Sequence, residues 1–167
     1  MIRLATLILL LLTGVGSAME IKREDLVGAW TYIESYSEFP DGKREVLFGE
    51  KPEGIFIILP NGRYSHIIMS PDLPKIKSGR FLDSTISEAE KIAEGVLAHF
   101  GTWTIDEKLG KFTVIIHKSS FPNIDGARQV RTVTQLDREF LSYINDLSVV
   151  DINRGVRVKA QLRRVWP

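Results

Sequence analysis

The chain has 167 residues, of which 44% are hydrophobic and 26% are charged; this fits one folded domain and argues against disorder, a coiled coil or a multi-pass membrane protein. Lysine and arginine number 22 against 21 aspartates and glutamates, so the chain lacks the basic excess that drives binding to nucleic acid or to anionic membranes. It contains no cysteine, which excludes disulfides, thiolate metal sites, thiol nucleophiles and a lipid-modified N-terminal cysteine.

The first 18 residues have the pattern of a cleaved secretory signal peptide. Arg3 provides positive charge, residues 4–12 form an apolar run, and residues 16–18 (Gly-Ser-Ala) match the small residues that signal peptidase reads. A membrane anchor is the alternative, but the run is shorter than the roughly 20 residues of a spanning helix. We therefore expect an exported protein, periplasmic or secreted, with no stable membrane anchor after cleavage; its mature chain begins at Met19 and forms one domain of residues 19–167.

Most of the mature chain alternates apolar and polar residues with the period of two that is typical of β-strands. Turn signals such as Pro40-Asp41-Gly42 separate these segments at short intervals. Short connections favour an antiparallel meander over a parallel sheet. The predicted strands, eight or nine in number, span residues 27–37, 44–48, 54–59, 63–69, 102–105, 111–118, 129–136, 140–145 and 156–165.

One segment has the apolar period of a helix. Its apolar residues recur at i, i+3 and i+4 steps, Ser87 and Glu90 form a capping-box pattern, and Gly101 stands where a C-terminal cap belongs. We expect this helix to pack its apolar stripe onto the sheet. The stripe consists of Ala89, Ile92, Ala93, Val96, Leu97 and Phe100.

Many antiparallel strands with one helix leave two architectures, an open sandwich and a closed up-and-down barrel. Gly28 and Trp30 stand on the first predicted strand and Arg164 on the last. This arrangement resembles the closing feature of the lipocalin superfamily, which implies that the tryptophan plugs one end of the barrel and that the arginine lies over its indole ring. We therefore predict an all-β fold, an antiparallel up-and-down barrel of about eight to nine strands with one helix packed on it.

Further local patterns along the chain resemble those of bacterial lipocalin-like domain proteins, in the same order and at compatible spacing. Together they span nearly the whole mature chain, and the resemblance implies a barrel that holds a ligand in its lumen. These patterns are residues 49–54 (Gly-Glu-Lys-Pro-Glu-Gly), 59–65 (Leu-Pro-Asn-Gly-Arg-Tyr-Ser), 69–74 (Met-Ser-Pro-Asp-Leu-Pro), 99–103 (His-Phe-Gly-Thr-Trp), 119–123 (Ser-Ser-Phe-Pro-Asn) and 129–131 (Gln-Val-Arg).

Strand alternation predicts which side chains line the lumen, because inward residues of one strand share a parity. If Trp30 points inward, as the resemblance implies, Tyr32, Glu34 and Tyr36 follow it. The parity of segment 129–136 stays open. Arg131 either lies on the outer face, paired with a carboxylate, or points inward to hold an acidic ligand group or to pair with Glu34.

The strands at 54–59 and 63–69 offer further lumen residues. Segment 54–59, which contains Phe56, is apolar at both its odd and its even positions, so one set faces the lumen and the other must be covered by another part of the chain. On segment 63–69, either the set of alternate residues that contains His66 or the other set could line the lumen. The three histidines lack an i, i+4 pair, and we expect no metal site. His99 falls in the last turn of the predicted helix, where a cation offsets the helix dipole.

No catalytic or nucleotide-binding motif stands in the sequence, and we expect no cofactor. The favoured function is binding of a small hydrophobic or amphipathic ligand in the lumen, oriented by Glu34, Tyr36, Arg131 and Tyr143. One alternative is an isomerase or cyclase that uses Glu34 or His66 as general acid or base. The other is a protein-interaction module with a filled barrel.

Overall fold

The computed structural model describes residues 21–145 and 155–165. The predicted signal peptide, residues 1–18, lies outside these residues, as does Met19. In the part of the chain that is described, no helix is both long and apolar enough to cross a membrane.

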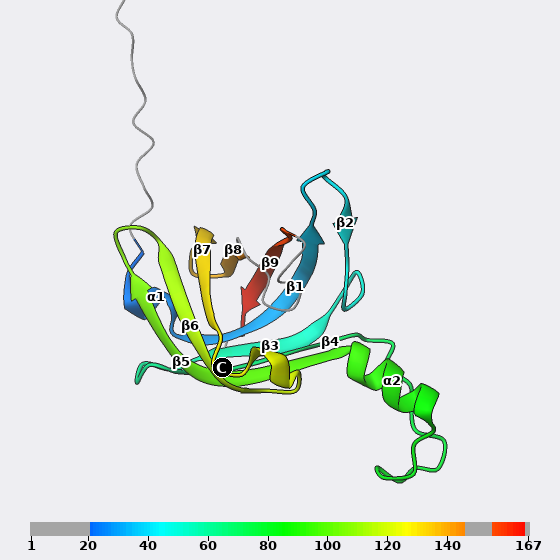
Figure 1. Cartoon of the computed structure of the whole chain (residues 1–167). Helices are drawn as coiled ribbons and strands as arrows, with labels where there is room; N and C mark the ends of the chain where they lie inside the picture. The colour runs from blue at the N-terminus through cyan, green and yellow to red at the C-terminus, as the bar shows by residue number, and fades with distance from the viewer. Residues whose placement is uncertain (1–20, 146–154, 166–167) are drawn as a thin grey trace, which may run out of the picture.

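The strands form one antiparallel sheet that closes on itself (Figure 1). They are β1 (Gly28–Glu38), β2 (Arg44–Glu45), β3 (Glu53–Ile58), β4 (Arg63–Met69), β5 (Val96–Asp106), β6 (Lys111–Ser119), β7 (Arg128–Leu136), β8 (Phe140–Asn145) and β9 (Arg157–Arg164). From β3 to β9 each strand pairs with the next, and β1 pairs with both β3 and β9, which closes a barrel of eight strands. The short β2 pairs only with the end of β1. The prediction of an antiparallel up-and-down barrel is confirmed.

One end of the barrel is closed by the predicted tryptophan and arginine. Trp30 is fully buried and pairs in register with Arg164, whose guanidinium carbon lies 4.0 Å from the centroid of the indole ring. The indole nitrogen donates to the carbonyl of Leu26, at the end of the short helix α1 (Arg23–Leu26). Arg164 also donates to the carbonyls of Asp25 and Val27. The first strand, the last strand and α1 are therefore joined at one point.

Gly28 is required at this closed end. Its φ of +144° is one that other residues rarely adopt, and a Cβ atom there would lie 2.7 Å from Nη1 of Arg164. Any side chain at this position would displace the guanidinium from the ring of Trp30. The closure feature predicted from Gly28, Trp30 and Arg164 therefore exists as a physical unit.

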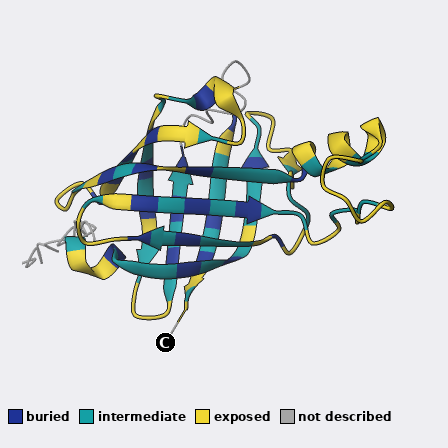
Figure 2. Cartoon of the chain, turned by 90° about the horizontal axis from the view of Figure 1, so that it is seen from below, coloured by how far each residue is buried: buried dark blue, intermediate teal, exposed yellow. Residues whose placement is uncertain are grey.

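The core follows the alternation of the strands, along which buried residues alternate with more exposed ones (Figure 2). On β6, for example, Phe112, Val114 and Ile116 are fully buried, while their neighbours on the strand are less so. Phe112 packs against Phe56 of β3 and against Tyr143 of β8. Aromatic rings from opposite walls therefore meet across the lumen.

The predicted helix is shorter than expected and does not cover the sheet. Helix α2 spans Ile86–Glu94, begins at the N-cap Thr85, whose side chain accepts from the amide of Glu88, and ends at Gly95. It has no buried residue and projects from the β4 to β5 connection (Figures 1 and 2). The prediction that an apolar stripe up to Phe100 packs onto the barrel is wrong, because residues 96–100 are the first part of β5, paired with β4.

Gly101 is likewise part of β5 and caps no helix. It stands where the pairing of β5 with β6 shifts register, and a Cβ atom would lie 1.9 Å from the carbonyl oxygen of Ile115. Glycine is needed here because the two backbones approach too closely for a side chain.

A β-bulge in β1 decides which of its side chains face the lumen. Tyr32 pairs with Leu162 of β9 and Glu34 with the next residue, Gln161, so one extra residue stands in β1. A bulge of this kind reverses the parity of the residues beyond it. Trp30 and Tyr32 are buried, but Glu34 is exposed. The prediction that Glu34 points into the lumen is therefore wrong.

Candidate functional site

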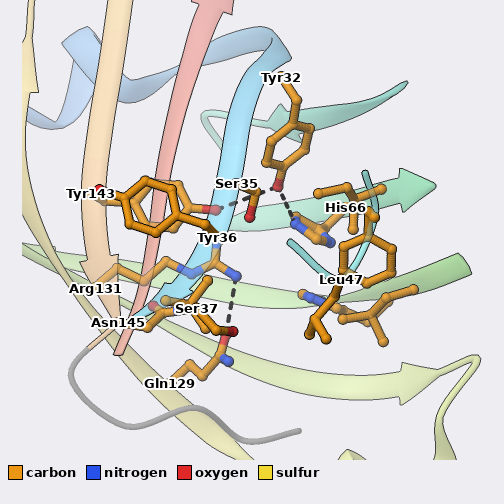
Figure 3. Close-up of a pocket in the computed structure, with 15 residues that line it drawn as sticks. Tyr32, Ser35, Tyr36, Ser37, Leu47, His66, Gln129, Arg131, Tyr143 and Asn145 are labelled. Carbon is orange, nitrogen blue, oxygen red and sulfur yellow. Dashed lines mark hydrogen bonds between the residues drawn. The ribbon is translucent and has the colours of Figure 1, made fainter. Parts of the chain in front are cut away.

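A cavity enters the barrel at the end opposite the Trp30 plug (Figure 3). Its walls extend from the buried Tyr32 and His66 to Leu47, which is 44% exposed, so the cavity reaches from the interior to the surface. The volume of about 60 Å³ suits a few water molecules or one small chemical group, because a water needs roughly 10–15 Å³ by this measure. The lining consists of Tyr32, Ser35, Tyr36, Ser37, Leu47, Phe48, His66, Ile68, Leu97, His99, Gln129, Arg131, Tyr143, Asn145 and Val158.

Arg131 on β7 points into the barrel and borders this cavity. Arg131 is 2% exposed, and its guanidinium carbon lies 4.8–5.5 Å from the ring centroids of Tyr143, Phe56 and Phe112. The parity that the sequence left open is thereby settled: Gln129, Arg131 and Val133 are the buried set of β7.

Among the described residues, no buried carboxylate balances the positive charge of Arg131. Nη2 donates to Oε1 of Gln129 at 3.1 Å, whereas Nε and Nη1 have no partner in the described structure. Glu34, the partner that the sequence suggested, stands in solvent on β1. A guanidinium keeps its charge in proteins, and the described residues compensate it with aromatic faces and one amide oxygen.

Strands β1 and β4 contribute a second polar group to the cavity wall. The hydroxyl of Tyr32 is hydrogen-bonded with Nε2 of His66 and lies 3.4 Å from the hydroxyl of Tyr143 (Figure 3). Nδ1 of His66 is buried and has no partner in the described structure. Burial is the main cause that raises the pKa of Tyr32 well above its ordinary value, and the nearby Tyr143 adds to it. The phenol is therefore neutral and keeps its proton at neutral pH.

The imidazole of His66 stacks on that of His99 from β5, with ring centroids 4.3 Å apart. Burial is the main cause that lowers the pKa of His66 well below its ordinary value, and His99 and Arg131 add to it. Burial and Arg131 lower the pKa of His99 to about 3. Nδ1 of His99 lies 3.0 Å from the hydroxyl of Tyr64, whose pKa burial raises to about 12. Both imidazoles are therefore neutral, and among the described residues the lumen holds one formal charge, that of Arg131.

The structure brings together four of the residues predicted for the ligand site: Tyr32, His66, Arg131 and Tyr143 all border the cavity. Tyr36 also borders it, but the guanidinium of Arg44 lies 4.6 Å over its ring. Phe56 is fully buried and does not border the cavity; it packs edge-on against His66. Glu34 belongs to the outer surface.

The lining residues that sequence reasoning missed include the polar side chains of His99, Gln129 and Asn145. His99 was assigned to a helix, although its neighbours 96–100 are also compatible with a strand. Gln129 shares the parity of Arg131 and becomes a candidate once that parity is known. Asn145 is the last residue of β8, buried and paired in register with Arg131. Its position could have been derived only from the register of β7 with β8.

The described part of the chain contains no group of three or more His, Asp or Glu side chains that could hold a metal ion. His66 and His99 form a stacked pair without an acidic neighbour in the described cavity wall, and His117 is exposed on β6. The arrangement can offer hydrogen-bond donors and one positive charge to a bound molecule.

Comparison with known proteins gives the family. The lipocalin-like domain family matches residues 27–163. The chain belongs to this family. No curated protein matches the chain in sequence.

Solved structures with a similar fold include natural and designed barrels. A lipocalin-like protein from Bacteroides uniformis is 14% identical, with a TM-score of 0.44, and the match covers 84% of this chain and 99% of that one. A redesigned β-barrel is 13% identical, with a TM-score of 0.42 and coverage of 86% and 94%. A de novo designed fluorescence-activating β-barrel is 14% identical, with a TM-score of 0.41 and coverage of 85% and 95%.

Proposed function

We propose that this lipocalin-like protein binds a small hydrophobic or amphipathic molecule in the lumen of its barrel. The observation that carries the proposal is a cavity whose wall includes three buried polar side chains with atoms that have no partner among the described residues, those of His66, Arg131 and Asn145. Buried polar groups in a folded protein are almost always paired. Three unpaired ones around one cavity are what a site looks like when its ligand supplies the missing partners.

Binding would follow from two physical terms. Burial of apolar ligand surface contributes roughly 25 cal/mol per Å², and the unpaired polar atoms fix the orientation of the ligand. The apolar contribution comes from apolar side chains of the lining, among them Leu47, Phe48 and Leu97. Leu47, which is 44% exposed, would be partly covered by the bound molecule.

The test uses isothermal titration calorimetry with a neutral probe, octan-1-ol, whose hydroxyl end is small enough for a cavity of about 60 Å³, and two matched variants. Ser37 is buried and borders the cavity, whereas Ser142 of β8 stands on the outer face. Ser37→Phe should abolish binding of the probe, because the phenyl ring occupies the cavity, and Ser142→Phe should leave it unchanged. Mass spectrometry of an organic extract of the native protein should find a copurified molecule. A wild-type protein that binds no probe and carries no such molecule would favour the protein-interaction alternative.

The same proposal includes export. The pattern of residues 1–18 supports cleavage by signal peptidase and a periplasmic or secreted location of the mature chain. N-terminal sequencing of the exported protein should begin at Met19. Protein found on the membrane with residue 1 intact would contradict cleavage.

A second candidate function is proton transfer on the bound molecule, as in an isomerase or cyclase. It is favoured by the hydrogen bond between the hydroxyl of Tyr32 and Nε2 of His66 at the cavity wall. A neutral phenol beside a neutral imidazole is a general acid and base pair, which contributes typically about 10²- to 10⁴-fold to a rate. Glu34, the other acid or base suggested by the sequence, is on the outer surface and takes no part.

This second function predicts exchange of carbon-bound hydrogen. A copurified ligand incubated in D₂O with the protein should gain deuterium, and Tyr32→Phe should abolish the gain while the ligand remains bound. Equal exchange with and without the protein would leave binding alone as the function.

A further inference from the structure

We infer that the molecule bound by this protein carries a carboxylate, and that Arg131 is its anchor inside the barrel. The inference rests on the proposed binding function and names the chemical class of the ligand, a small hydrophobic organic acid. It follows from charge, from hydrogen-bond geometry and from the size of the cavity.

The first step is charge. Moving an isolated ion from water into a protein interior costs several kcal/mol, even after relaxation. Arg131 is 2% exposed, both neighbouring histidines are neutral, and no described carboxylate is buried. The ring faces of Phe56, Phe112 and Tyr143 offset part of this cost. A bound anion would offset the rest.

The second step is the geometry of the guanidinium. Nη2 carries two hydrogens and gives one of them to Gln129, while Nε and Nη1 are unpaired among the described residues. Nη2 forms one edge of the guanidinium with Nε and another with Nη1, and Gln129 occupies only one of these two edges. The other edge, either Nε with Nη2 or Nη1 with Nη2, presents two parallel N–H donors. A planar carboxylate accepts from such a pair with both oxygens.

The third step is the set of donors near the guanidinium. With Tyr32 donating to Nε2 of His66, the proton of that neutral imidazole resides on Nδ1, which has no partner in the described structure. The hydroxyl of Tyr143 can donate to a ligand as well, since its contact with the hydroxyl of Tyr32 is a long one of 3.4 Å. Beside one acceptor, Oδ1 of Asn145, the cavity wall therefore offers donors from three strands and one positive charge, a balance that suits an anion and disfavours a cation.

The cavity also sets size and orientation. About 60 Å³ holds a carboxylate and a few carbon atoms but no long chain. The head group therefore enters first, and the apolar remainder lies towards Leu47 and Phe48 at the rim. Phosphate and sulfate can also accept from both donors of a guanidinium edge, but they lack the apolar part that would lie against Leu47 and Phe48.

The experiment compares octanoate with octan-1-ol by isothermal titration calorimetry, on wild-type protein freed of copurified material. Octanoate should bind about 10- to 100-fold more tightly, the range for a charge-assisted hydrogen-bonded pair. Arg131→Met, which keeps the apolar stem, should remove this preference, so that octanoate binds no more tightly than octan-1-ol. Arg128→Met is the matched control, because Arg128 is exposed on the same strand; it removes the same charge and should keep the preference.

The outcomes separate this inference from the proposed function. Binding of octan-1-ol without a preference for octanoate would overturn the carboxylate while sustaining the binding function. Inorganic phosphate or sulfate that competes with octanoate at equal concentration would also overturn it, in favour of a general anion site. Asp146 and Asp151 lie outside the described residues; tighter octanoate binding by the double variant Asp146→Asn/Asp151→Asn would show that the chain supplies its own anion.

Discussion

At the scale of single residues, the lumen combines an unbalanced charge with neutral polar groups. Arg131 is worth less to stability than its many contacts suggest, because its charge is desolvated and its Nε and Nη1 atoms are unpaired in the described structure. Residues kept at a cost to stability mark functional sites in many proteins. The effect of replacing Arg131 on the stability of the ligand-free protein therefore tests whether this residue is kept for binding.

Arg131→Met should leave the ligand-free protein as stable as wild type or more stable, by up to about 2 kcal/mol. The reason is that a buried charged group is replaced by an apolar side chain of similar length, while the cation–π contacts with three rings are lost. Urea unfolding of the extracted protein measures it, with Arg128→Met as a surface control that should change by less than about 0.5 kcal/mol. A loss of about 3 kcal/mol or more, roughly the cost of breaking a buried pair, would mean that the charge has a partner in the free protein.

The stacked histidines should make the protein sensitive to acid. The pKa of His99 is lowered to about 3 and that of His66 well below its ordinary value, whereas both titrate near about 6.5 in the unfolded chain. Between these values the unfolded state binds protons that the folded state does not, so stability is full above about pH 6.5 and falls as the pH drops towards about 3. Each histidine contributes a slope of up to about 1.4 kcal/mol per pH unit.

His99→Gln tests this dependence. The change should flatten the pH dependence of the free energy of unfolding between about pH 6 and 4 by the contribution of one histidine, measured by urea unfolding across this range. His117→Gln is the control, since His117 is exposed on β6, and should leave the slope as in wild type. A slope that His99→Gln does not change would show that His99 becomes protonated within the barrel.

At the scale of elements, the barrel and the helix contribute unequally to stability. Helix α2 has no buried residue, so Ile92→Ala should change the free energy of unfolding by less than about 1 kcal/mol. Leu162→Ala on β9 removes a fully buried side chain and should cost about 2–5 kcal/mol. Chemical denaturation of the two variants measures the contrast. A cost for Ile92→Ala as large as that for Leu162→Ala would mean that α2 packs against the barrel after all.

The elements also show what could be read from the sequence. Each of the nine strands was predicted, because period-two alternation and turn residues are local signals, and only the first half of β5 was missed. The apolar pattern of residues 96–100 is compatible with the period of a helix and with that of a strand. These residues form a strand because β5 pairs with β4 on one side and with β6 on the other. The prediction that Glu34 faces inward was wrong for a similar reason, because the bulge that reverses the alternation of β1 arises from its pairing with β9. Local sequence patterns therefore predict the strands, whereas the residues that meet at the site depend on pairing between strands that are distant in sequence.

The same limit applies to the candidate site. Tyr32, His66, Arg131 and Tyr143 were predicted from residue type and strand position, and they meet at the cavity. That Arg131 lacks a carboxylate could not be predicted, because it depends on where every acidic residue of the described chain lies. This absence, which carries the inference of an organic acid, is visible only in the folded barrel.

At the scale of the whole molecule, two features stand at opposite ends of the barrel. The closed end is held by Trp30, Arg164 and α1, and the other end contains the cavity. The plug packs around Trp30, and neither Trp30 nor Arg164 lines the cavity. Closure of the barrel and the candidate binding site are therefore located at different ends of one structure.

Closure of the barrel should be measurable at Trp30. Trp30→Ala removes a fully buried indole and its hydrogen bond to Leu26, and should cost about 3–5 kcal/mol. Arg164→Met should cost less, because Arg164 is partly exposed, although it loses the cation–π contact and its hydrogen bonds to backbone carbonyls. The effects should be less than additive in the double variant, since each residue stabilises the other across the β1 to β9 seam. Urea unfolding of all four proteins measures this coupling, and strictly additive losses would show that the ring and the guanidinium act independently.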